Sequence, residues 1–262
     1  MLSDTLVRCA PAPGLALLHR RGAPTGTREL SMWRLRLGPG ECVSHQLDDE
    51  ETVVVLLEGQ GTLGAGDASW RVSRQSVFAE RATALYVPAG TPCTAQASTG
   101  LEAILVSTPT SAGGEPALVD PAGIEVLHRG RDAYARDVHE LFVHDAHARR
   151  LMVGETFTPP GHWSSFPPHK HDGRDGEPCL EEIYYFKVQP SQGFGQQMLY
   201  TAGGETVTHV VRDGDVVLLP YGYHPVCSTP GYELYYLWAM AGAERKLALY
   251  EDPAHRWIAE GA

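Results

Sequence analysis

The stretch GDVVLLPYGYH, residues 214–224, is an apolar strand that ends in a Pro-x-Gly turn, with a histidine two residues after the glycine. Residues 84–92, ALYVPAGTP, have the same form without the histidine. In both places a polar turn leads to a further apolar strand, at 101–106 and at 233–238. Short apolar runs bounded by Gly and Pro are typical of buried β-strands. Their recurrence about half a chain apart predicts two similar β-domains.

The repeat extends upstream of these turns. Residues 50–56, EETVVVL, resemble residues 181–186, EEIYYF. Further back the offset between the copies is shorter, which fits an extra loop at 172–180 in the second copy. We therefore predict a first domain over residues 1–125 and a second domain over residues 126–262.

The composition agrees with an all-β fold with few short helices. The 262 residues suffice for one large all-β domain or two small ones with a hydrophobic core, and 43% of them are hydrophobic. The 28 glycines and 19 prolines fall between short runs rich in β-branched and aromatic residues, as in sandwiches and barrels. One stretch differs, because charged and apolar residues interleave at 128–150. We expect a partly helical bridging segment there.

The net charge limits the kinds of partner that the protein can bind, and the cysteines indicate the compartment in which it works. The net charge of −11 argues against nucleic acid, whose phosphates it would repel, but leaves room for a small anion beside a local arginine. No apolar run approaches the roughly 18 residues that a membrane-spanning helix needs. The N-terminus lacks the pattern of a signal peptide. The five cysteines form no CxxC pair, so we expect reduced thiols and a cytoplasmic protein.

The segment PPHKHDG, residues 167–173, predicts a metal centre in the second domain. His169 and His171 are one residue apart, which places both imidazoles on one face of a strand. With His224 and a carboxylate, for which Glu182 is the candidate, they complete a set of three histidines and one carboxylate suited to a divalent metal.

The first domain lacks the equivalent residues. It offers only His45 as a candidate ligand, and Pro92 stands where the second copy has its last histidine. Proline has no side-chain donor for a metal. We therefore expect a structural barrel without metal over 1–125 and the chemistry in the second barrel.

Both histidine segments resemble the two sequence motifs of the cupin β-barrel, and the second motif fits well at 214–222. Two features depart from the usual cupin pattern. His224 stands one residue closer to the Pro-x-Gly turn, and Glu182 follows His171 after a longer gap. Longer blocks resemble the 5-deoxy-glucuronate isomerase family of inositol breakdown, a bicupin family related to the 5-keto-4-deoxyuronate isomerases. These blocks are SVFAERATALYVPAG (76–90), GHWSSFPPHKHDG (161–173), LEEIYYFKV (180–188), GFGQQMLYT (193–201), 216–242 and DPAHRW (252–257).

The resemblance implies an all-β bicupin built of two antiparallel β-barrel or jelly-roll domains. It also implies that Glu182, at the head of its strand, is the ligand carboxylate. Glu181 is expected on the opposite face of that strand. Asp175 and Glu177 are alternatives nearer the usual cupin spacing, in a Gly-rich loop.

The activity that the resemblance implies is the metal-dependent interconversion of 5-deoxy-glucuronate and 2-deoxy-5-keto-gluconate. Such an aldose–ketose isomerisation moves a proton between neighbouring carbons through an enediol. A divalent ion bound to the substrate oxygens stabilises the developing charge as a Lewis acid. Zinc, manganese and iron all suit three imidazoles and one carboxylate.

The reaction also needs a general base and a cation for the substrate carboxylate. Glu155, Tyr200 and Gln197 are the candidates for catalysis. Arg174 and Arg136 are the candidates for the carboxylate. Tyr223, beside the last histidine, is the candidate for a further substrate contact.

Three other functions are compatible with the same set of metal-binding residues. They are another uronate isomerase, an iron-dependent cupin dioxygenase, and a sugar-binding cupin without turnover. An oxygenase needs O₂ whereas an isomerase works without it. Pairing of flat β-faces into a homo-oligomer stays open.

Overall fold

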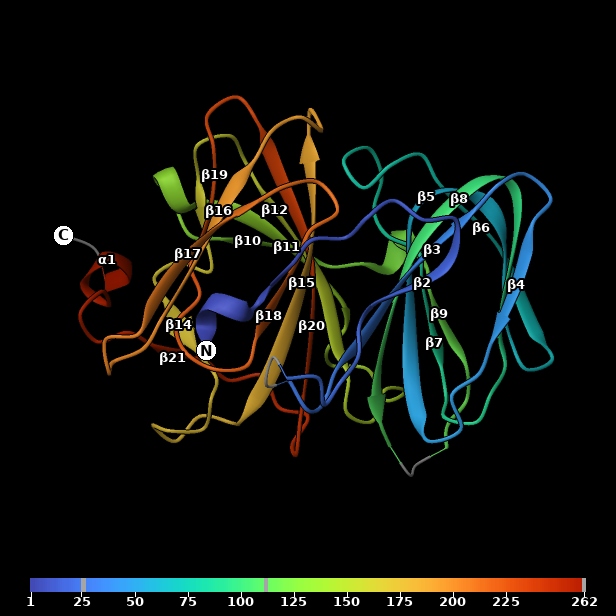
Figure 1. Cartoon of the computed structure of the whole chain (residues 1–262), viewed down its shortest axis with the longest axis horizontal. Coiled ribbons are helices and arrows are strands. Elements are labelled where there is room, and N and C mark those ends of the chain that lie inside the picture. Colours follow the sequence, from blue (N-terminus) through green and yellow to red (C-terminus); the bar gives the residue numbers. More distant parts are fainter. Residues whose placement is uncertain (25–26, 111–112, 261–262) are drawn as a thin grey trace.

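Two antiparallel β-units lie side by side along the long axis of the molecule in the computed structural model, which describes residues 1–24, 27–110 and 113–260 (Figure 1). The prediction of an all-β fold is confirmed. The helices of the described residues are short: three 3-10 helices, η1 (Leu2–Asp4), η2 (Pro121–Gly123) and η3 (Asp132–Tyr134), and one α-helix, α1 (Trp257–Glu260).

The N-terminal unit is a single sheet of eight strands. Its two longest strands, β5 and β8, pair along most of their length, with register shifts at Leu56/Glu58 and Gly59/Gly61. Such irregularities bend a strand, so one pair of strands can serve two faces of a barrel. The strands of this unit are β2 (Gly14–His19), β3 (Ser31–Leu37), β4 (Cys42–His45), β5 (Glu50–Ala65), β6 (Ala68–Arg74), β7 (Ala84–Val87), β8 (Cys93–Pro109) and β9 (Ala117–Val119).

The C-terminal unit has a large sheet in the order β1-β18-β15-β20-β12-β11-β10, a four-stranded sheet in the order β13-β19-β16-β17, and the pair β14-β21. The large sheet comprises β1 (Leu6–Val7), β10 (Val126–Arg129), β11 (Arg136–Phe142), β12 (Met152–Thr158), β15 (Leu180–Gln189), β18 (Val216–Leu219) and β20 (Glu233–Gly242). The smaller sheets comprise β13 (Trp163–Ser164), β14 (His169–Lys170), β16 (Gly195–Tyr200), β17 (Thr206–Val211), β19 (Val226–Ser228) and β21 (Tyr250–Glu251).

Two expectations about domain organisation need correction. The stretch 128–150 is not a partly helical bridge, because β10 and β11 in it are strands of the large sheet, and only the 3-10 turn η3 lies between them. The prediction that residues 1–125 form the first domain also needs correction at its N-terminal end. Strand β1 pairs with β18, so the start of the chain completes the C-terminal sheet, where Figure 1 shows the N-terminus.

Side-chain alternation along the large sheet creates two different buried faces. In β20, Tyr236, Trp238 and Met240 face the interior of the C-terminal unit. Leu237 and Ala239, which lie between them in the strand, pack instead into a core that also contains residues of the N-terminal unit. Full burial of an aliphatic or aromatic side chain stabilises the fold by about 1.5–3 kcal/mol. Each unit therefore has its own core, and a third core joins the two units.

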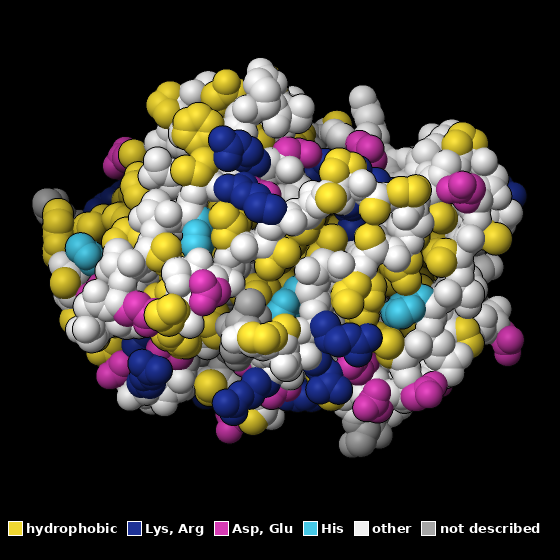
Figure 2. All heavy atoms as spheres, viewed as in Figure 1, with side chains coloured by type: hydrophobic (Ala, Val, Ile, Leu, Met, Phe, Trp, Pro, Cys, Tyr) yellow, Lys and Arg dark blue, Asp and Glu magenta, His cyan; other side chains and the backbone are white. Residues whose placement is uncertain are grey.

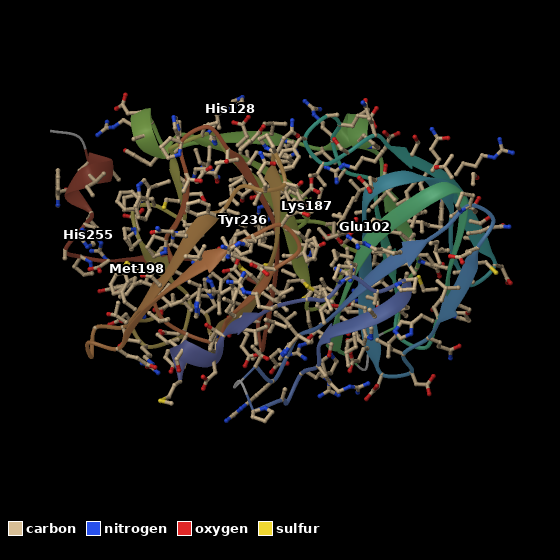
Figure 3. All side chains as sticks on the ribbon, turned by 45° about the horizontal axis from the view of Figure 1, so that its top comes forward. Glu102, His128, Lys187, Met198, Tyr236 and His255 are labelled. Carbon is tan, nitrogen blue, oxygen red and sulfur yellow. The ribbon has the colours of Figure 1, made fainter. Side chains whose placement is uncertain are left out.

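Polar contacts also cross the boundary between the units. Lys187 and Glu102 lie where the units meet (Figure 3), with 3.9 Å between Lys187 Nζ and Glu102 Oε2. The Tyr185 hydroxyl donates to Glu102 at 3.3 Å from the same strand as Lys187. On the face in Figure 2, basic side chains lie in small groups separated by acidic and neutral ones. That face presents no continuous basic surface of the kind that a phosphate backbone requires.

Candidate metal centre and pocket

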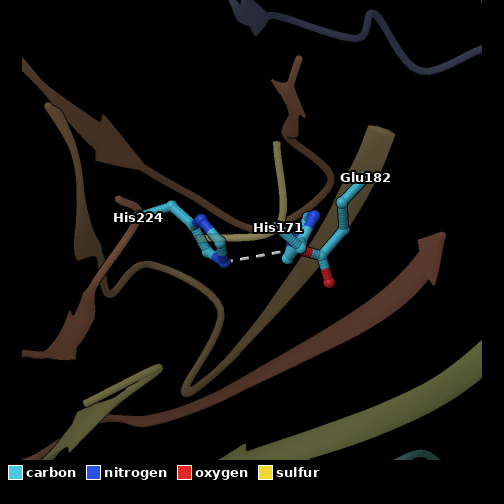
Figure 4. A group of neighbouring side chains, drawn as sticks. All are labelled: His171, Glu182 and His224. Atoms are coloured by element: carbon cyan, nitrogen blue, oxygen red, sulfur yellow. Dashed lines mark hydrogen bonds and ion pairs between the residues drawn. The ribbon is translucent and has the colours of Figure 1, made fainter. Parts of the chain in front are cut away.

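His171, Glu182 and His224 converge inside the C-terminal unit (Figure 4). One potential ligand atom from each lies within 4.8 Å of the others, and all three residues are buried. His171 Nε2 is 3.1 Å and His224 Nε2 is 3.4 Å from Glu182 Oε2. This spacing fits side chains that surround one ion.

His169 adds a third imidazole to this group. Its ring lies 5.0 Å from the ring of His224, centroid to centroid, and nearly perpendicular to it. The ring of His171 lies at the same distance from His224. The structure thus brings three of the predicted ligands, His171, Glu182 and His224, within 4.8 Å of one another, with the ring of His169 beside that of His224.

The local fold explains how each ligand reaches this point. Glu182 has the same parity in β15 as the interior residues Tyr184 and Phe186, so it faces inward. His224 follows the turn at Gly222, whose φ is +88° and whose hypothetical Cβ would lie 2.6 Å from the Tyr200 carbonyl oxygen. Only glycine tolerates both conditions. The Pro-x-Gly turn therefore fixes where His224 enters the barrel.

The chemistry of the donor set fits a divalent metal. Backbone carbonyls accept from the Nδ1 atoms of His171 (Leu180, 2.7 Å) and His224 (Gly222, 3.0 Å), which leaves both Nε2 atoms directed at the centre. His224 Nε2 is buried without a hydrogen-bond partner among the described residues. Outer hydrogen bonds of this kind orient metal-binding histidines.

Burial lowers the pKa of His169 and of His224 to about 3, so both imidazoles are neutral at pH 7, as ligation requires. Burial also acts on His171, but its hydrogen bond to Glu182 outweighs that effect and raises its pKa.

The alternative carboxylates are engaged elsewhere. Glu181 faces the N-terminal unit, where it accepts from the backbone N–H groups of Arg28 (2.6 Å) and Glu29 (2.8 Å). Asp175 and Glu177 both pair with Lys170, whose ammonium group faces away from the histidines. Of the four candidates, Glu182 alone faces the histidine cluster.

A pocket of about 490 Å³ opens beside the cluster, and His169 and Glu182 line it. Its wall includes the aromatic residues Phe166, Tyr184, Tyr236 and Trp238. Figure 3 places Tyr236 within the C-terminal unit, whereas His128 and His255 lie at its periphery. The volume is in the range that small-molecule sites occupy.

Arg136 and Arg174, the two arginines proposed for the substrate carboxylate, occupy different environments. Arg136 lines the pocket, and its Nη1 donates to the carbonyl oxygens of Phe166 (2.9 Å) and Tyr134 (3.1 Å). No carboxylate of the described residues forms an ion pair with it, and burial lowers its pKa. Arg174 is 62% exposed, lies over the Tyr221 ring and does not line the pocket. Of these two arginines, only Arg136 lines the pocket, where it can meet a bound anion.

Glu155 does not reach the pocket, which corrects its prediction as a base. It is fully buried on the opposite face of β12, where it pairs with Arg74 of the N-terminal unit and accepts from the Tyr235 hydroxyl at 2.7 Å. Thr156, its neighbour, is the residue of β12 that lines the pocket.

Tyr200, Tyr223 and Gln197 lie behind the cluster and do not line the pocket. The Tyr200 hydroxyl donates to Asp252 at 2.6 Å, and its ring stacks on Tyr223. The Gln197 amide donates to the His224 carbonyl oxygen at 2.7 Å. These contacts support the segment that carries His224 rather than meeting a substrate in the pocket.

Sequence reasoning assigned no site role to the pocket hydroxyls. Ser165 Oγ lies 3.2 Å from the Tyr184 hydroxyl and 3.4 Å from the Tyr236 hydroxyl, and all three residues line the pocket. For Tyr184 the sequence did contain an indication of a site role. Tyr184 stands two residues after Glu182 in the same strand, so both side chains lie on the same face.

The second of the two antiparallel β-units holds three histidines and a glutamate beside a pocket. These features define a bicupin with a cluster of residues suited to bind a metal. The chain belongs to the KduI/IolB family, whose model matches residues 16–258.

Named relatives share most of their length with this chain. It is 38% identical over 230 residues to a 5-deoxy-glucuronate isomerase of Geobacillus kaustophilus, which covers 86% of this chain and 83% of the relative. The identity to the 5-deoxy-glucuronate isomerase of Halalkalibacterium halodurans is 36%, with 97% of both chains covered.

Solved structures agree with this assignment. The crystal structure of an IolB-like protein from Salmonella typhimurium superposes with a TM-score of 0.92 at 32% identity, covering 98% of this chain and 99% of that one. The oxalate decarboxylase of Lactobacillus farciminis has a TM-score of 0.67 at 16% identity, covering 100% of this chain and 89% of that one, which supports the bicupin fold alone. Over the described part of the chain, no helix is both long and apolar enough to cross a membrane.

Proposed function

We propose that this protein is a metal-dependent aldose–ketose isomerase that interconverts 5-deoxy-glucuronate and 2-deoxy-5-keto-gluconate in inositol breakdown. One observation carries the proposal: a single pocket is lined by His169 and Glu182 of the predicted ligand set and by Arg136, a cation with no carboxylate partner among the described residues. The substrate has a carbonyl at one end and a carboxylate at the other. Identity to relatives named 5-deoxy-glucuronate isomerase over most of the chain supports the choice of substrate.

His169, His171, His224 and Glu182 would hold a divalent ion, for which zinc, manganese and iron are the candidates. When bound, such an ion supplies Lewis-acid stabilisation of the charge that develops on the substrate oxygens. His171, Glu182 and His224 are buried, and His169 is partly buried where it lines the pocket.

Arg136 binds the substrate carboxylate in this proposal. Its Nη1 is fixed by two backbone carbonyls, which leaves other N–H donors of the guanidinium for an anion. A buried cation without a carboxylate partner gains a charge-assisted hydrogen bond when an anion enters. The substrate is thereby oriented with its aldehyde end toward the histidine cluster.

The hydroxyls of Ser165, Tyr184 and Tyr236 hydrogen-bond the sugar hydroxyls. Burial and the nearby carboxylate Glu182 raise the pKa of Tyr184 well above its ordinary value. Tyr184 therefore keeps its proton and can donate to a substrate oxygen. The aromatic rings of Tyr184 and Tyr236, which line the pocket, exclude water from the reacting carbons.

A dioxygenase on the same cage is the rival function, and oxygen dependence separates the two. The test is an anaerobic NMR time course of the purified protein with 5-deoxy-glucuronate. Loss of the aldehyde-derived signals with growth of the keto acid is expected. No conversion by metal-loaded protein would overturn the proposal. The five cysteines, all unpaired in the structure, suit the reducing cytoplasm in which we place the reaction.

A further inference from the structure

The pair of strands β14 and β21 brings the C-terminal part of the chain beside the metal cluster. Their register sets His169 opposite Glu251 and Lys170 opposite Tyr250. Directly opposed residues of an antiparallel pair have their side chains on the same face, with Cβ atoms about 4.5–5.5 Å apart. Glu251 is thus a cross-strand neighbour of His169.

The two faces of this strand pair are distinguished by their contacts. Lys170 Nζ lies 5.0 Å from the centroid of the Tyr250 ring, and Lys170 pairs with the carboxylates of the 172–180 loop, away from the pocket. His169 and Glu251 both line the pocket, as do Leu247 and Leu249 on the chain leading to β21. The Glu251 side chain therefore projects toward the cavity beside the cluster.

The carboxylate of Glu251 is also available to accept a proton. Its backbone pairs with β14 and accepts from the Arg256 guanidinium, but no hydrogen bond or ion pair engages its carboxylate among the described residues. The other two carboxylates that line the pocket are occupied. Glu182 belongs to the cluster, and Glu140 lies 3.3 Å from His144.

We propose that Glu251 is the general base of the isomerisation, a role that rests on the proposed function. Its carboxylate takes the proton from the carbon next to the aldehyde, and the electron pair of that C–H bond forms the C=C bond of the enediol. The charge moves to the former carbonyl oxygen.

The same carboxyl group then returns the proton to the former aldehyde carbon. The proton of the neighbouring hydroxyl moves to the former aldehyde oxygen, and the second carbon becomes the ketone. Atoms and charge balance without any co-reactant. One carboxylate beside the cluster therefore suffices for both proton transfers at carbon.

The experiment compares Glu251→Gln with Glu140→Gln, a matched change in a carboxylate of the same pocket. Three quantities are measured for each protein: bound metal per chain, kcat with 5-deoxy-glucuronate, and ²H incorporation into substrate and product in ²H₂O. Glu251→Gln should keep its metal, lose kcat by about 10²–10⁴-fold and lose ²H incorporation in parallel. Glu140→Gln should stay within about tenfold of wild-type kcat.

Three outcomes would overturn the proposal. If Glu251→Gln kept the kcat of wild type, Glu251 would not be the base. If Glu251→Gln lost its bound metal, Glu251 would be a metal ligand. If the large loss of kcat occurred in Glu140→Gln instead, Glu140 would be the base. Glu251→Asp should recover part of the turnover, because it keeps a carboxylate. If wild-type protein itself fails to convert 5-deoxy-glucuronate, the proposed function fails, which is a result distinct from all of these.

Discussion

Arg74 and Glu155 form a bidentate ion pair that is fully buried between the two β-units. Arg74 Nη1 lies 2.7 Å from Glu155 Oε1, and Nη2 lies 3.1 Å from Oε2. The guanidinium also donates to the carbonyl oxygens of Leu56 and Glu80. Every polar group of the pair is thereby paired, which is the condition under which a buried ion pair is tolerated. The carboxylate that sequence reasoning offered as a catalyst instead holds the two units together.

Replacing Arg74 with Met should destabilise the protein by about 3–5 kcal/mol, because it leaves the Glu155 charge buried and unpaired. The double change Arg74→Met with Glu155→Met should cost less than the single change, since no charge remains. Urea denaturation measures both. Equal losses in the two proteins would show that the charge of Glu155 is not what destabilises the single variant.

Glu155→Gln should leave kcat within about tenfold of wild type under conditions where the variant is folded, because Glu155 faces away from the pocket. The measurement is turnover per folded molecule, with the folded fraction taken from circular dichroism. A loss of kcat by several orders of magnitude with intact fold and metal would contradict the position of Glu155 outside the chemistry.

Arg136→Gln should lower kcat/KM for 5-deoxy-glucuronate by about 10- to 100-fold, because a charge-assisted hydrogen bond contributes about 1.5–3 kcal/mol. Arg174→Gln is the matched control and should leave kcat/KM near wild type. Steady-state kinetics of the two variants decide between the arginines. A loss confined to Arg174→Gln would place the substrate carboxylate outside the pocket described above.

Tyr184→Phe should lower kcat/KM several-fold, since one hydrogen bond to a neutral hydroxyl contributes about 1 kcal/mol. Tyr185→Phe removes a hydroxyl from the next residue of the same strand, but on the face toward Glu102. That control should change stability and not kinetics. If Tyr184→Phe and Tyr185→Phe lost activity equally while both kept their full metal content, Tyr184 would not be a specific substrate contact.

His19 should make the N-terminal unit sensitive to acid. Burial lowers the pKa of His19 from 6.5 to about 4, and the ring contacts the Thr27 hydroxyl. Between these values the unfolded chain binds a proton that the folded chain does not, so stability falls as pH drops from 6.5 toward 4. His19→Gln removes this contribution. Its free energy of unfolding should therefore fall less than that of wild type between pH 7 and pH 4.5, measured by urea denaturation; an equal fall would contradict the prediction.

The parts of the site that could be predicted from sequence are those that depend on local geometry. The parity of His169 and His171 and the turn before His224 are properties of short segments. Both all-β architecture and the internal repeat follow from strand patterns and turn residues. These features can be predicted without knowing which strands pair with one another.

The assignment of Glu155 failed because it depended on long-range packing. The large sheet is buried on both faces, one inside the C-terminal unit and one against the N-terminal unit, so β12 lacks the polar and apolar alternation that would show its inner face. Tyr184 and Tyr236 could not be told from ordinary core residues for the same reason. Glu251 enters the pocket only because β21 pairs with β14, a contact between segments far apart in the sequence.

The central claim is that the His/Glu cluster holds the metal on which isomerisation depends. The most direct test strips the protein with a chelator, adds back zinc, manganese or iron(II) in steps under anaerobic conditions, and measures bound metal and conversion of 5-deoxy-glucuronate together. We predict that turnover rises in proportion to bound metal and saturates at one ion per chain, and that His224→Gln neither retains metal nor recovers activity. Undiminished turnover by metal-free protein, or full metal retention by His224→Gln, would contradict the account.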